Sequence, residues 1–243
     1  MTLALDLHIH SDASCDGRLT PAEIIAAARS AGLDGAAICD HDVMPDLDDV
    51  PIPDGFLLIP GVELSTDLGH ILGLFLESAP EVSDRSAGAA IEAIHAAGGI
   101  AVLAHPFQRD PDEDRLLSLL GHIDGVETFN GRADRKRRDA NDRAAAFAKK
   151  HGLPAFAGSD AHVAREIGNA RLRVEVSERR LSAVREAVLK GGGTASGVSG
   201  QHIDVAKSQW TRLKKCGAGY GAFGKWALFA VKCAAEDLFR RQK

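Results

Sequence analysis

Residues 6–16, DLHIHSDASCD, decide how the rest of this chain is interpreted. Leu7 and Ile9 favour a strand, in which alternate side chains point to opposite faces. His8 and His10 then project from one face, where they can bind a metal ion together. Asp16 can turn back from the following loop toward the same ion. A single His-x-His pair is equally typical of hydrogen-bonded histidines, so a metal site needs a second motif.

The second motif is Asp160-Ala161-His162, which follows the apolar residues 155–157. It repeats the arrangement of the first motif, with two ligand-type side chains on one face of what we expect to be the last strand. In a closed barrel the first and last strands are neighbours. The two rows of ligands are therefore expected to meet.

Short apolar stretches alternate with helical ones along the chain. We expect strands at 3–10, 35–39, 56–66, 70–76, 100–104, 125–129 and 155–157, and helices after the capping box Thr20-Pro21-Ala22-Glu23, over 84–97, near 113–121 and over 133–151. This alternation predicts βα units around a buried parallel sheet, and polar residues at the strand ends favour an α/β barrel of about seven strands. A doubly wound open sheet is the alternative, but no G-x-G-x-x-G turn follows the first strand.

Four further ligand-type residues fall at strand ends or starts on the same rim: His41, Glu63, His70 and His105. With the five residues of the two motifs and their loop, they make nine. One zinc ion takes about four ligands, so nine ligands indicate two or three divalent ions.

These motifs together resemble the PHP (polymerase and histidinol phosphatase) family of metal-dependent phosphoesterases. The resemblance covers about residues 3–176 and rests on His8-Ile9-His10, Asp40-His41-Asp42, Gly61-Val62-Glu63, Ala104-His105-Pro106 and Gly158-Ser159-Asp160-Ala161-His162. It implies a distorted, TIM-like (β/α)7 barrel that holds up to three metal ions.

The resemblance also implies how the ligands are shared. One ion would be held by His8, His10, Glu63 and Asp160, and a second by Glu63, His70 and His105, with Glu63 bridging the two. Asp16, His41 and His162 would hold the third, with Asp16 where some family members have histidine. No ligand position is vacant, which speaks against a degenerate copy without activity.

Such a centre predicts attack of a metal-activated hydroxide on phosphorus. The ligand set accepts Mn, Fe or Zn. We expect Asp160, His162 and Arg132 to act in catalysis, because Arg132 ends the Asn130-Gly131-Arg132 turn, which similar family members carry, and can neutralise phosphoryl oxygens. Arg132, Asn130 and Arg109 are the expected substrate-binding residues.

The expected activity is hydrolysis of a phosphate monoester of a small metabolite, of the histidinol phosphate or nucleotide bisphosphate type. A 5'-3' exonuclease on short RNA or DNA is the alternative, favoured by the basic run 135–138 and the basic tail. A metal-binding module without turnover and a metal-dependent amide or lactone hydrolase are further alternatives.

Composition places the chain among soluble globular proteins, with 45% hydrophobic residues, 26% charged residues and a formal net charge of -5. Its four cysteines have no paired spacing, which is typical of reduced thiols. We find neither a signal-peptide pattern nor an apolar stretch of the roughly 18 residues that a transmembrane segment needs. A cytoplasmic location is therefore expected.

The residues after 190 differ from the rest. We expect a phosphoesterase barrel over 1–190, and a Gly-rich flexible linker and basic helical tail over 191–243. The segment from residue 207 to residue 243 contains nine Lys/Arg and only two acidic residues, Glu236 and Asp237. It therefore carries a formal charge of +7, and the remainder of the chain carries about -12. Residues 222–239 form an amphipathic pattern, and charge favours docking on the barrel or a second subunit over a membrane. The pattern leaves the oligomeric state open.

Overall fold

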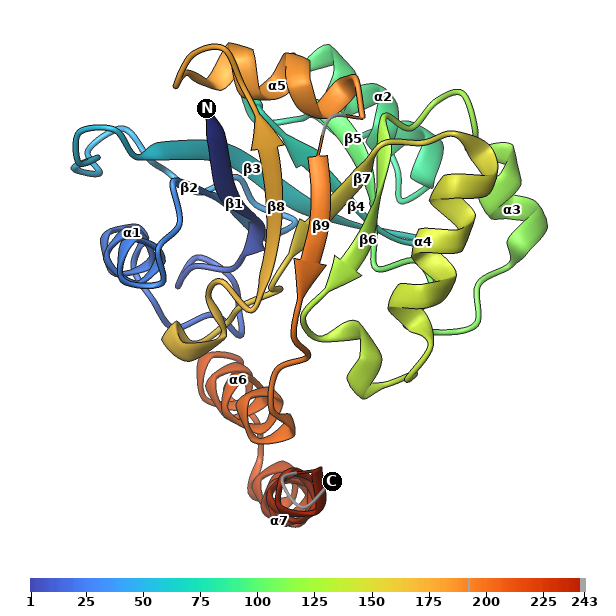
Figure 1. Ribbon diagram of the computed structural model, residues 1–243. Helices are drawn as coiled ribbons and strands as arrows, with labels where there is room; N and C mark the ends of the chain where they lie inside the picture. The colour runs from blue at the N-terminus through green and yellow to red at the C-terminus, as the bar shows by residue number, and fades with distance from the viewer. Residues whose placement is uncertain (192, 241–243) are drawn as a thin grey trace.

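One curved sheet organises the computed structural model, which describes residues 1–191 and 193–240 (Figure 1). Within these residues its strand order is β7-β6-β5-β4-β3-β2-β1-β8-β9. The strands are β1 (Thr2–Ile9), β2 (Gly35–His41), β3 (Leu57–Thr66), β4 (Gly69–Leu74), β5 (Ile100–Ala104), β6 (Gly125–Asn130), β7 (Ala155–Gly158), β8 (Ala170–Glu175) and β9 (Gly193–Gly197).

The sheet nearly closes into a barrel where β1 meets the end of β7. Ile9 forms a parallel bridge with Ala161, and the amide of His10 donates to the carbonyl of Ala161 at 2.8 Å. The amide of Asp160 donates to the carbonyl of His8 at the same distance. The prediction of a distorted barrel is confirmed, and the two ligand motifs lie side by side.

The βα alternation had predicted a parallel sheet throughout, and this prediction was wrong for β4. β1, β2 and β3 run parallel, as do β5, β6 and β7, but β4 is antiparallel to both of its neighbours. Only residues 67 and 68 separate β3 from β4, and so short a connection forms a hairpin, because a parallel crossover needs a dozen residues or more.

The helices lie outside the sheet (Figure 1). They are α1 (Pro21–Ser30), α2 (Ala87–Ala96), α3 (Glu113–Ser118), α4 (Ala140–His151), α5 (Leu181–Leu189), α6 (His202–Lys215) and α7 (Tyr220–Arg240), with 3-10 turns η1 (Ala133–Arg135) and η2 (Ala164–Glu166). The capping box of Thr20 and Glu23 is present at α1. The helix expected over 133–151 is split, because Asn130 Oδ1 accepts from the amides of Arg132 and Ala133 and keeps η1 at the strand end.

A register shift in β1 decides where its side chains point. Leu3, Leu5 and Leu7 pack in the core cluster that α5 closes at one end of the barrel, whereas Ile9 packs against α1 in another cluster. Regular strand alternation would place Leu7 and Ile9 on one face, opposite His8 and His10, and this expectation is wrong. The irregularity lies between Asp6 and Ile9, and a bulge of this kind re-aims the residues after it.

The tail is more ordered than its composition had predicted. Residues 193–197, expected in a flexible linker, form β9 in antiparallel pairing with the edge strand β8. That prediction was wrong for these residues, because the open edge of β8 supplies hydrogen-bond partners that a glycine-rich sequence does not reveal. The division into two domains at residue 190 stays a prediction, and Gly192 and residues 241–243 lie outside the described residues.

The two last helices form a hairpin at the end of the barrel opposite α5 (Figure 1). α7 contains the predicted amphipathic helix, and its Trp226 packs against Trp210 of α6 with ring centroids 4.5 Å apart and the rings tilted by 43°. Trp226 Nε1 also donates to the carbonyl of Ala206. Among the described helices, none combines the length and apolar character that crossing a membrane requires.

Candidate metal centre

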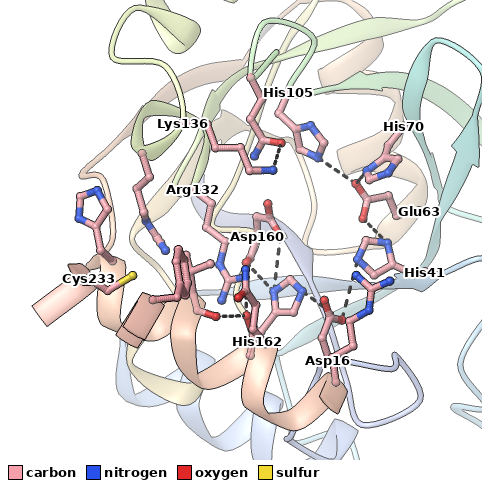
Figure 2. Close-up of a pocket in the computed structure, with 18 of the residues that line it drawn as sticks. Asp16, His41, Glu63, His70, His105, Arg132, Lys136, Asp160, His162 and Cys233 are labelled. Atoms are coloured by element: carbon pink, nitrogen blue, oxygen red, sulfur yellow. Dashed lines mark hydrogen bonds and ion pairs between the residues drawn. The ribbon is translucent and has the colours of Figure 1, made fainter. Parts of the chain in front are cut away.

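Glu63 lies at the centre of a group of imidazoles (Figure 2). Its Oε1 is 2.7 Å from His70 Nδ1 and 2.9 Å from His105 Nε2. Its Oε2 is 2.8 Å from His41 Nδ1, 3.4 Å from His10 Nε2 and 3.5 Å from His8 Nε2. One buried carboxylate therefore meets ring nitrogens from five histidines, which come from β1, β2, β4 and the end of β5.

The remaining three predicted ligands complete the group. Asp160 Oδ1 is 3.4 Å from His10 Nε2 and 3.5 Å from His162 Nδ1. Asp16 Oδ1 is 3.3 Å from His162 Nε2. The structure thus brings together all nine residues that the sequence had proposed as metal ligands.

The donor atoms fit divalent cations. The Nε2 atoms of His8 and His10 are 3.1 Å apart, close enough to bind one ion. Among the described residues, no well-aligned hydrogen bond reaches the buried atoms Glu63 Oε2 and Asp16 Oδ1, although ring nitrogens lie 2.8 Å from the first and 3.3 Å from the second. Burial would raise the pKa of the Glu63 carboxyl, but His8 and His70 hold that pKa well below its usual range. An ionised carboxylate among imidazoles is the chemistry of a metal site.

Within the described residues, four sets of three ligand atoms lie within 4.8 Å of one another: His8, His10 and Glu63; His41, Glu63 and His70; His10, His41 and His162; His8, His105 and Glu127. The first matches the predicted first ion without Asp160. The others group the side chains differently from the second and third predicted ions, so the assignment of ligands to individual ions stays a prediction.

Backbone strain is concentrated at the centre. Asp160 has φ 55° and His105 has φ 29°, in the left-handed region that residues other than glycine seldom adopt. Such conformations persist where the surrounding structure holds them, often at functional sites. Gly158 is needed beside them, because a Cβ atom there would lie 2.1 Å from the Cβ of His8.

Sequence analysis missed Glu127, which lies in the interior of β6. Its Oε1 is 3.0 Å from His8 Nδ1, and its Oε2 accepts from the amide of His105 at 2.9 Å. A carboxylate on the second ring nitrogen fixes the tautomer and direction of a ligating histidine. The available signal was a charged residue inside an otherwise apolar predicted strand.

Asp40 serves the loop that carries Asp16. It accepts from the amide and hydroxyl of Ser11 at 2.7 and 2.5 Å, and from the amide of Ser14 at 3.1 Å. Ser14 Oγ in turn lies 3.2 Å from His10 Nδ1. Asp40 therefore positions the backbone after β1.

Arg132 lines the cavity but is held by the protein. Its Nε and Nη2 form a bidentate ion pair with Glu166 at 3.0 and 2.5 Å, and its Nη1 donates to Ser208 Oγ of α6 at 3.2 Å. Both members of this ion pair are buried, and Glu166 also accepts from the amide of His162. Contact of Arg132 with substrate stays a prediction, and the ion pair gives it a fixed position.

The other two expected substrate residues differ in their surroundings. Asn130 is fully buried and its Nδ2 donates to Glu127 Oε2 at 2.9 Å, which is the contact of a positioning residue. Arg109 is exposed beside a second hollow that also includes His70 and His105. Their contact with substrate stays a prediction.

Seven of the nine predicted ligands, all except the fully buried His8 and His10, line a cavity of about 420 Å³ that the tail helps to form. In Figure 2 Glu63, His41 and His70 lie on one side, and Cys233 of α7 lies on the opposite side beyond Arg132. Residues of α6 and α7 complete this wall: His202, Val205, Ser208, Gln209, Arg212, Phe229, Lys232, Cys233 and Glu236. The tail therefore contributes to the site, which its sequence did not reveal.

This chain is similar in sequence to several known proteins. A sequence profile described as PHP-associated matches residues 138–192. An uncharacterized protein of Methanocaldococcus jannaschii is 31% identical over 182 residues, which is 70% of each chain. A 5'-3' exoribonuclease of Haemophilus influenzae is 43% identical over 81 residues, which is 30% of this chain and 29% of that protein.

Among solved structures, a two-domain Bacteroides vulgatus protein that contains a predicted PHP-like metal-dependent phosphoesterase has the same fold. Its TM-score is 0.66 at 22% identity, over 87% of this chain and 70% of that one. The fold is therefore that of the PHP-like metal-dependent phosphoesterases. This chain belongs to the PHP family.

Proposed function

We propose that the protein hydrolyses a phosphate monoester of a small metabolite, of the histidinol phosphate or nucleotide bisphosphate type. The observation that carries this proposal is the convergence of Glu63 with eight other ligand-type side chains, seven of the nine lining a cavity that also contains arginine and lysine. Bound divalent ions would supply an activated water and neutralise phosphoryl charge. A cytoplasmic location, two or three ions, and Mn, Fe or Zn as the metal belong to the same proposal.

The chain's own residues would divide the remaining work. Glu63 and the histidines around it, together with Asp16, Asp160 and His162, would hold the ions. Glu127 and Ser14 fix the rings of His8 and His10 through their Nδ1 atoms. Arg132, kept in place by Glu166, would bind the phosphoryl oxygens. Asp160 and His162 would contribute to catalysis as ligands of the ions.

A 5'-3' exonuclease acting on short RNA or DNA is the second candidate. The similarity of 81 residues to an exoribonuclease supports it, and so do the basic side chains Lys136, Arg212 and Lys232 in the cavity wall. The helical hairpin favours a small substrate or a single-stranded end, because residues of α6 and α7 form one wall of the cavity.

A turnover screen tests the proposal. The purified full chain, loaded with Mn²⁺ and with its metal content measured, is incubated with an aryl phosphate, histidinol phosphate, a nucleoside bisphosphate and 5'-phosphorylated oligonucleotides. We expect phosphate release from a small monoester that is lost in Glu63→Gln. Release of mononucleotides from oligonucleotides alone would favour the exonuclease, and full metal content without any turnover would favour a binding module.

A further inference from the structure

The cavity continues beyond the predicted metal ligands to a part enclosed by η1, α6 and α7. This second part is basic. Its cationic side chains are Arg135, Lys136, Arg212 and Lys232, in addition to Arg132. Arg132 is neutralised by its bidentate contact with Glu166, so the positive charge of this part of the cavity comes from the other four side chains.

Arg135 is the buried member of the group. Its side chain is 3% exposed, and its Nη2 donates to Glu166 Oε1 at 2.9 Å. Its Nε and Nη1 are buried and have no hydrogen-bond partner among the described residues. A buried donor without an acceptor costs free energy, so such a guanidinium in the wall of a cavity indicates an acceptor that comes from outside the protein.

The helical hairpin adds two further cations. Within the described part of the chain, Arg212 has no ion pair, and the carboxylate nearest to Lys232 Nζ is Glu236 Oε1 at 3.8 Å. Lys136 Nζ donates to the neutral Gln108 Oε1 at 3.0 Å. Five cationic side chains, Arg132, Arg135, Lys136, Arg212 and Lys232, thus face only the carboxylates of Glu166 and Glu236 within the described residues, so this part of the cavity keeps a net positive charge.

We propose that this part of the cavity is a second oxyanion subsite, formed by Arg135, Arg212 and Lys232. Its ligand is a phosphate or carboxylate group of the substrate, separate from the phosphate that reacts at the metal centre. The identification of the ligand as part of a substrate rests on the proposed function, whereas binding of an oxyanion does not. The substrate is accordingly a small molecule with two acidic groups.

Binding of inorganic sulfate to the full chain after metal removal tests the subsite by itself. Arg212→Met and Lys232→Met alter exposed side chains, and Lys225→Met removes the same charge from α7 at a position outside the cavity wall. By titration calorimetry we expect about fivefold weaker sulfate binding for each variant and about 20-fold for the double variant, with Lys225→Met unchanged. Equal affinity of the double variant and the wild type would overturn the proposal, as would an equal loss in Lys225→Met.

Kinetics then test whether the substrate carries a second acidic group. The ratio of kcat/KM for a nucleoside 3',5'-bisphosphate to that for the matched 5'-monophosphate should fall about 20-fold in the double variant. The same ratio for 3-phosphoglycerate against glycerol phosphate shows whether a carboxylate serves equally. Unchanged ratios with weakened sulfate binding would overturn the substrate assignment. Absence of turnover with every compound would contradict the proposed function, while the sulfate titration still decides the subsite.

Discussion

Lys215 at the end of α6 should control the loop that carries Asp16. Its Nζ donates to the carbonyls of Asp12, Ser14 and Gly17 at 2.7, 2.8 and 3.0 Å. All three N–H donors of one ammonium are therefore used on a single loop. Lys215→Met keeps the aliphatic stem and removes these contacts.

The size of the effect follows from the three contacts. A hydrogen bond to a charged group contributes about 1.5–3 kcal/mol when buried, but this ammonium lies in a part-exposed position, so we take about 0.5–1 kcal/mol for each contact. The loop would then lose roughly 1.5–3 kcal/mol of stability, which increases its open population by about 10- to 100-fold.

Amide hydrogen exchange of residues 11–19 measures this opening. The amides of Asp12 and Ser14 are protected by Leu19 and Ser11 carbonyls, so they should exchange about 10- to 100-fold faster in Lys215→Met. Lys225→Met is the control for loss of charge from the tail. Unchanged exchange of the loop, or equal acceleration in Lys225→Met, would refute the reasoning. Metal titration should in parallel show weaker binding of the ion that Asp16 is proposed to hold.

Three other outcomes are expected. Glu63→Gln should reduce turnover by orders of magnitude and lower the metal content, because a neutral amide bridges ions poorly; near-normal activity with full metal would contradict the bridging role. Mn²⁺ added to the chelator-treated chain should raise the melting temperature, by the equivalent of about 4 kcal/mol at 1,000 times Kd, and an unshifted transition would contradict the metal site. Asp237 accepts from the amides of His202 and Ile203 at 2.8 and 2.9 Å. Burial by itself would raise the pKa of the Asp237 carboxyl, but these hydrogen bonds outweigh it and lower that pKa. A carboxyl whose pKa is lowered by folding stabilises the folded state at pH values above its unfolded pKa of 3.8. This stabilisation is lost as the pH falls through the pKa of the folded state. The fluorescence of the two tryptophans, both in the hairpin, should therefore report loosening of α6 and α7 in acid, and Asp237→Asn should loosen them at neutral pH; identical acid profiles of variant and wild type would contradict this role.

Several features could be predicted from the sequence because they depend on near neighbours along the chain. The alternation of strand residues places His8 and His10 together, and the capping box starts α1 at Pro21. The spacing of apolar residues predicts α7. The meeting of the first motif with Asp160 followed from a single topological assumption, that the barrel closes, and the bridge between Ile9 and Ala161 confirms it.

The tertiary structure decided what depends on segments far apart in the chain. β9 is a strand because β8 offers an open edge, although the sequence of residues 193–197 has no strand pattern. The partner of Arg132 is Glu166, 34 residues away, and Lys215 reaches the loop of Asp16 across about 200 residues.

The same limit applies to the functional site. The sequence by itself determined which ligand-type residues form the candidate metal centre, because each of them lies in a strand or in the segment after one, and the apolar pattern of a strand is local. That Glu127 orients His8, and that α6 and α7 close the cavity with basic side chains, was decided only by packing. Contacts between distant segments arise from the relative placement of whole elements, and local sequence patterns carry no record of that placement.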